Sequence, residues 1–105
     1  MVNYGLEDRV AIITGANNPQ GIRAATAVAL AREVARYGIT VNCVAPGPTQ
    51  TGWIDEDLEK AVIPLIPIGK LIQAEDIAET ILFLASEQAE MITGQVIKVS
   101  GGKAM

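Results

Sequence analysis

The residues with the clearest capacity for chemistry lie in a glycine-bearing turn near the start of the chain. An apolar, β-branched run at residues 10–13 leads into a turn with Gly15 and Gly21, and an alanine-rich segment begins at Ile22. A strand that stops at glycine and restarts as a helix is typical of a βαβ unit. The first N–H groups of that helix have no partner within it, and its dipole is positive there. We therefore expect Gly15, Asn17, Gly21 and Ile22 to hold a phosphate group, although a tight connection that needs glycine explains the same residues.

A second candidate stretch follows the next predicted strand. The run at residues 39–45 is apolar and β-branched, and Pro46-Gly47-Pro48 stops it. Two strands joined by one helix are expected to be parallel, with a right-handed crossover. Both strands then end at the same edge of the sheet, which brings residues 46–51 beside the glycine turn. A rigid loop after a strand is the alternative interpretation of this stretch.

Composition excludes several classes of function. The 105-residue chain has a net charge of −4 and its Lys and Arg residues are isolated, which argues against a nucleic-acid groove. The chain lacks His, the commonest general base and metal ligand, and we predict no metal site. Cys43 is the single cysteine, which favours a reducing, cytoplasmic setting. The apolar helix near residues 77–85 is too short to span a bilayer, so we expect no membrane partner.

These candidates need a frame of alternating strands and helices in one domain over residues 1–105. We expect strands at residues 10–13, 39–45 and 95–99 and helices at 21–37 and 73–89, with Gly38 closing the first helix. Residues 55–62 could form two helical turns, with their acids at the favourable amino end. Residues 49–73 read as a loop or lid broken by prolines. Its apolar side chains either line a substrate lid or, as we favour, cover the core or an interface: Trp53, Ile54, Ile63, Leu65 and Ile66.

Three blocks of the chain, in order, resemble one family. Residues 6–15 (LEDRVAIITG) with Gly21-Ile22 resemble the opening of a classical short-chain dehydrogenase/reductase of the 3-oxoacyl-(acyl-carrier-protein) reductase type. Residues 37–47 (YGITVNCVAPG) resemble its sixth strand and Pro-Gly turn, and residues 67–102 its carboxyl-terminal third. Residues 1–33 thus resemble the amino-terminal βα unit, and residues 34–105 the end of the family domain.

The resemblance implies an α/β, Rossmann-like fold and an oxidoreductase that uses NAD or NADP. It implies cofactor contacts at Gly15, Asn17, Gly21 and Ile22, and contacts to the nicotinamide end from the second stretch. The residues of that second set are Pro46, Gly47, Thr49 and Thr51. Arg23 stands where the family has a third glycine, so its guanidinium either obstructs the pocket or pairs with a phosphate.

The resemblance also implies a chain more than twice as long, whose middle would carry the catalytic Ser and a Tyr-x-x-x-Lys pair. Neither Tyr4 nor Tyr37 has Lys four residues later, the spacing that lowers the phenol pKa, and Ser86 and Ser100 lie near the carboxyl end. We therefore assign no catalytic residue and expect this chain alone to be inactive. A non-catalytic nucleotide- or anion-binding module and a ligand-free scaffold are the alternatives.

The junction between the two family blocks falls in the first helix. The stretch at residues 29–33 could end the family's first helix, and residues 30–38 could equally end its fifth, so we expect a join in frame there. The result is a reduced sheet of three parallel strands with flanking helices. In simple strand order, two right-handed crossovers would place both long helices on one face. The bare face, and the family's use of its last helix and strand in subunit contacts, predict a homo-oligomer.

Overall fold

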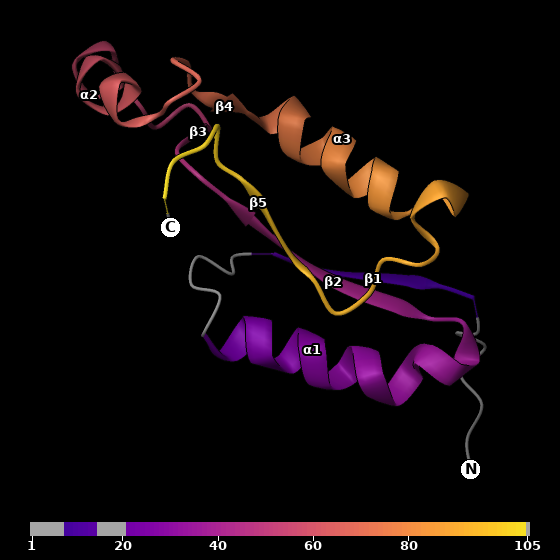
Figure 1. Cartoon of the computed structure of the whole chain (residues 1–105). Helices are drawn as coiled ribbons and strands as arrows, with labels where there is room; N and C mark the ends of the chain where they lie inside the picture. Colours follow the sequence, from indigo (N-terminus) through magenta and orange to yellow (C-terminus); the bar gives the residue numbers. More distant parts are fainter. Residues whose placement is uncertain (1–7, 15–20, 105) are drawn as a thin grey trace.

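The computed structural model describes residues 8–14 and 21–104 of the chain (Figure 1). Strands and helices alternate along it: β1 (Val10–Thr14), α1 (Ile22–Val34), β2 (Thr40–Pro46), β3 (Thr49–Gln50), α2 (Glu56–Val62), β4 (Ile72–Gln73), α3 (Ala74–Leu84) and β5 (Val96–Val99). Short 3-10 turns follow each helix: Ala35–Tyr37, Ile63–Leu65 and Glu87–Ala89. No helix within these described residues is long and apolar enough to cross a bilayer.

The main sheet has three parallel strands in the order β1-β2-β5, which confirms the predicted reduced Rossmann-like sheet. β1 pairs with β2 from Val10 opposite Thr40 to Thr14 opposite Val44, and β5 pairs with the second half of β2. Residues 41–45 of β2 are all buried, because a central parallel strand is covered on both faces. A second, two-residue parallel pair joins β3 to β4 inside the stretch expected to be a loop.

The two long helices lie on opposite faces of this sheet, so the expectation that both share one face is wrong (Figure 1). The strand order is simple, and the two crossovers therefore have opposite hands. The right-hand preference arises when a strand feeds directly into a helix that packs back on the sheet. Between β2 and α3 the chain instead runs through β3, α2 and β4, and α3 returns over the other face.

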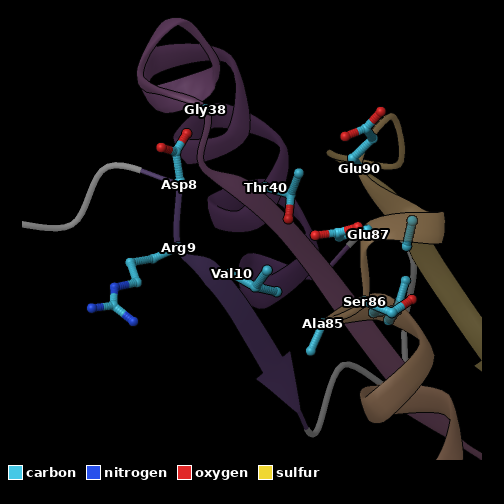
Figure 2. A pocket seen from close by; sticks show the side chains of 11 residues that line it. Asp8, Arg9, Val10, Gly38, Thr40, Ala85, Ser86, Glu87 and Glu90 are labelled. Carbon is cyan, nitrogen blue, oxygen red and sulfur yellow. The ribbon is translucent and has the colours of Figure 1, made fainter.

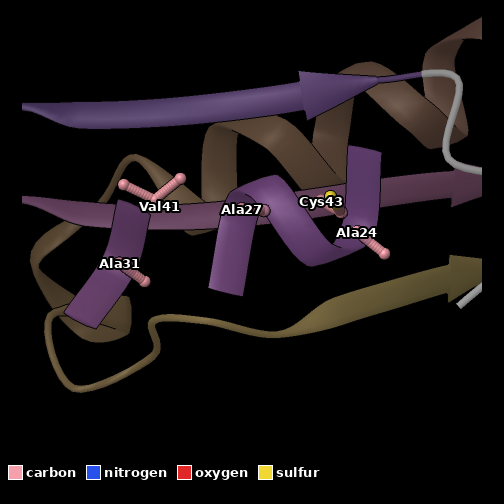
Figure 3. Packing of buried hydrophobic residues seen from close by; sticks show 5 residues of the cluster. All are labelled: Ala24, Ala27, Ala31, Val41 and Cys43. Carbon is pink, nitrogen blue, oxygen red and sulfur yellow. The ribbon is translucent and has the colours of Figure 1, made fainter. Parts of the chain in front are cut away.

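Helix α1 packs closely on β2 through small side chains. Ala24, Ala27 and Ala31 are buried against Val41 and Cys43 of the strand, as Figure 3 shows. Alanine at these positions lets the helix backbone approach the sheet. The helix extends over most of the predicted range and closes at residue 38, a glycine with φ of +73°, as predicted.

The other two helices start at side-chain caps. Asp55 accepts a hydrogen bond of 2.8 Å from the Leu58 N–H, and the acidic start of α2 matches the prediction. Asp76 accepts one of 2.8 Å from the Gln73 N–H in a capping box at α3. α3 ends at Leu84, earlier than the predicted residue 89, because the backbone is extended again at residue 86.

A second apolar cluster holds the β3–β4 region together. Ile66, Leu71 and Ile72 are buried there, with Ile54 and Ile63 packed against them. The lid candidates therefore divide: three of them are core residues, whereas the side chains of residues 53 and 65 are 88% and 60% exposed.

Candidate functional site

The carboxyl edge of the main sheet gathers the described residues of the predicted site. Figure 1 shows the amino end of α1 on the same side of the molecule as the carboxyl ends of β1 and β2. Gly21 is the N-cap of α1, with extended backbone (φ −75°, ψ 169°), and Ile22 opens the helix with its side chain 87% exposed. Gly15 and Asn17 lie outside the described residues. The first turn of α1 carries no acidic residue, so its partial positive charge is not neutralised by a carboxylate there.

Gly47 joins the ends of β2 and β5. Its N–H donates to the Val99 carbonyl at 2.9 Å, and a Cβ built on Gly47 would lie 2.9 Å from the Ser100 Cα. Only glycine allows this approach of two backbones. The Thr49 hydroxyl donates to the Gly47 carbonyl at 2.9 Å, which rigidifies the loop, while Thr51 is exposed.

Arg23, at the start of α1, has its backbone carbonyl against the thiol of Cys43 in β2. The Arg23 side chain is exposed, and its carbonyl accepts a long hydrogen bond of 3.5 Å from the Cys43 Sγ. Burial raises the pKa of the Cys43 thiol, which keeps it protonated and unreactive. This environment fits the prediction of an inert packing residue.

Sequence reasoning gave no hint of a cavity at the opposite, amino edge of the sheet. It has a volume of about 320 Å³ and lies between the starts of β1 and β2 and the end of α3. Figure 2 shows Glu87 directed toward Thr40 and Arg9 directed away. The Thr40 Oγ1 is buried without a hydrogen-bond partner within the part of the chain that the structure describes. The residues that line this cavity come from segments far apart in the sequence, so no local motif predicts it.

Asn42 is a further residue whose importance the apolar run around it concealed. It is fully buried, donates to the Ile92 carbonyl at 3.0 Å and accepts from the Gln95 N–H at 3.1 Å. The Thr93 hydroxyl accepts from the Val41 N–H at 3.0 Å nearby. These bonds fix the segment before β5 to β2. A polar residue in the middle of an apolar strand was the only available signal.

Metal ligands do not gather among residues 8–14 and 21–104: no group of three or more His, Cys, Asp or Glu there could hold an ion. The arrangement at the carboxyl edge is instead one of backbone donors, glycine and hydroxyl groups. Such a set suits an anionic group better than a cation.

Comparison with known proteins assigns a lineage to this arrangement. A family profile described as enoyl-(acyl carrier protein) reductase matches residues 15–104. A 3-oxoacyl-(acyl-carrier-protein) reductase from Rickettsia felis is 47% identical over 79 residues, covering 72% of this chain and 33% of its own length. A (2S)-[(R)-hydroxy(phenyl)methyl]succinyl-CoA dehydrogenase subunit from Thauera aromatica is 50% identical over 80 residues, covering 73% of this chain and 32% of its own length.

Solved structures match a larger part of the chain than these sequences do. A hydroxysteroid dehydrogenase from Escherichia coli superposes with a TM-score of 0.81 and 28% identity, over 91% of this chain and 46% of the other. A 3-ketoacyl-(acyl-carrier-protein) reductase from Brucella melitensis, solved with NADH, gives a TM-score of 0.75 and 27% identity over 91% and 44%. The chain spans about a third of the length of its curated relatives.

Proposed function

Since the chain belongs to the short-chain dehydrogenase/reductase family, we propose that it is a nucleotide-binding unit of that lineage, taking NAD or NADP at its carboxyl edge without catalysing hydride transfer alone. The observation that carries this proposal is the coincidence, at one edge, of the amino end of α1 and the glycine loop after β2. NADH is present in a solved relative of the same family.

The chain's own residues supply the means of holding such a cofactor. The N–H groups at the amino end of α1, at Gly21 and Ile22, would face a pyrophosphate, and we propose that Gly15 and Asn17, which precede them in the sequence, also contact it. Pro46, Gly47, Thr49 and Thr51 would face the nicotinamide end. When bound, the nicotinamide would supply the hydride; the residues of this chain bind and orient it.

The described residues offer no phenol beside an ammonium for the proton that must accompany a hydride. Tyr37, the phenol among these residues, lies in the 3-10 turn after α1, at the opposite end of that helix from the carboxyl edge, with the Arg36 guanidinium 5.0 Å from its ring centroid. The Ser86 hydroxyl donates to the Phe83 carbonyl, which occupies it locally, and Ser100 is buried. A ketone bound at the carboxyl edge would therefore receive no proton from these groups, which supports a binding rather than a catalytic role.

The test is an equilibrium titration of NADH and NADPH, followed by their fluorescence. We expect saturable binding, which Ile22→Glu weakens at least about tenfold because a carboxylate replaces an exposed side chain at the positive end of the helix. Ala29→Glu, exposed in the middle of the same helix, is the matched control and should leave binding unchanged. Arg23→Gly tightens binding if the guanidinium obstructs the site and weakens it if it pairs with phosphate.

A ligand-free scaffold is the outcome if neither cofactor binds to the wild type or to Arg23→Gly. We further propose a cytoplasmic setting, consistent with a single buried, unpaired cysteine. We also propose self-association through α3 and β5, where Leu82 and Phe83 are 70% and 49% exposed. Sedimentation of the wild type as a monomer at micromolar concentration would contradict self-association.

A further inference from the structure

The outer edge of β1 carries unpaired backbone groups within the described residues, because β1 has a single neighbour in the sheet. The Thr40 N–H donates to the Arg9 carbonyl at 3.3 Å, and Thr40 lies opposite Val10. In a parallel ladder the residues of one strand alternate in direction, so Arg9, Ala11 and residue 13 face β2. Val10, Ile12 and Thr14 therefore direct their N–H and C=O groups outward.

Nothing in β1 protects this edge from another strand. Its five residues, VAIIT, include no charge, no proline and no glycine, the devices by which proteins usually protect an edge strand. The face of β1 that carries Val10 and Ile12 is also thinly covered, since α3 packs over β2 and β5. Val10 is 38% exposed as a result.

We infer that a second copy of this chain pairs with β1 in an antiparallel manner, about a two-fold axis that passes beside Ile12. Outward groups at residues 10, 12 and 14 then meet those of residues 14, 12 and 10 of the second copy. Exchange of N–H and C=O groups at these pairs gives about six hydrogen bonds. The spacing is symmetric about Ile12, so the edge is complementary to itself.

Pairing with the second copy also covers apolar side chains of β1, in addition to providing partners for its backbone groups. A two-fold axis perpendicular to the sheet keeps both copies of α1 on one face and both copies of α3 on the other. Ile12 then lies beside its counterpart on the thinly covered face, as an apolar cross-strand pair, and Val10 lies opposite residue 14 of the second copy. The product is a continuous sheet of about six strands, the usual size for a sheet. This contact is at the opposite edge of the sheet from β5 and does not depend on cofactor binding.

Cross-linking tests the register directly. Position 12 faces itself across the axis, so a single cysteine there links two copies. In a Cys43→Ala background, Ile12→Cys should form a covalent dimer in high yield with a short bis-maleimide at micromolar protein concentration. Leu58→Cys in the same background is the control, because Leu58 is 47% exposed on α2, away from this edge. Equal yields from the two variants would overturn the inference.

Sedimentation velocity provides a second readout. Ile12→Pro removes an outward N–H but leaves the ladder to β2 intact, and Ile12→Lys places two ammonium groups together at the axis. Each variant should halve the association state of the wild type while its circular dichroism stays native. If the proline variant fails to fold, the Ile12→Lys variant tests the pairing at β1. An unchanged sedimentation coefficient in a folded variant would contradict the two-fold pair.

Discussion

Replacing Asn42 by alanine is expected to be among the most destabilising single substitutions in this chain. The side chain is 0% exposed, donates to the Ile92 carbonyl and accepts from the Gln95 N–H. Alanine leaves both backbone groups without a partner, and each buried orphan costs about 1–3 kcal/mol. Gln95 is an exposed residue, so we expect a total in the lower half of that sum, about 2–4 kcal/mol. In a domain of this size each kcal/mol lowers the Tm by about 4–8 °C.

Urea denaturation followed by circular dichroism measures this loss. Gln95→Ala is the matched control, because the Gln95 side chain is exposed and its hydrogen bond within the described residues goes to the nearby Thr93 carbonyl at 3.1 Å. The control should stay within about 0.5 kcal/mol of wild type. Equal free energies of unfolding for Asn42→Ala and Gln95→Ala would show that Asn42 does not fix the segment before β5 to β2.

Three further outcomes follow from the packing. Ala27→Leu should destabilise by about 1–3 kcal/mol in urea denaturation, because α1 has no room against β2, whereas Ala29→Leu on its exposed side should be nearly neutral. Gly47→Ala should lower the Tm measurably, because its Cβ would meet the Ser100 backbone, and a Tm equal to wild type would refute that contact. Burial raises the pKa of the Cys43 thiol in the folded protein. The stability that this thiol contributes to the free energy of unfolding is therefore present below the ordinary thiol pKa of 9.0 and is lost as pH rises above it. Its thiol should therefore react with a disulfide reagent at pH 8 only as fast as the protein unfolds, and immediate labelling would contradict this.

The elements of the main sheet could be predicted because their sequence patterns are local. The β-branched runs of β1, β2 and β5 match the predicted strands closely, and the acidic starts of α2 and α3 fall where their caps form. The placement of α3 could not be predicted from a rule about direct crossovers, since a long connection separates it from β2. The β3–β4 pair is two residues long on each side and has no periodicity to detect.

Some features of the candidate site could likewise be predicted from sequence, and others could not. Glycine at positions 21 and 47 and the proline at 46 could be identified from sequence, because turns and close backbone approach require particular residue types. The amino-edge cavity and the unpaired edge of β1 arise from contacts between distant segments. Residue type alone does not reveal them, because Thr40 and Ile12 are ordinary strand residues until their neighbours are known.

A single-turnover assay tests the account most directly. Protein in excess over NADPH, or over NADH, is mixed with a small 3-oxoacyl thioester, and the absorbance of the reduced nicotinamide is followed under conditions where fluorescence titration gives saturation. We predict bound cofactor and no oxidation beyond the protein-free rate. Stoichiometric loss of the reduced nicotinamide would mean that a group of this chain supplies the proton after all.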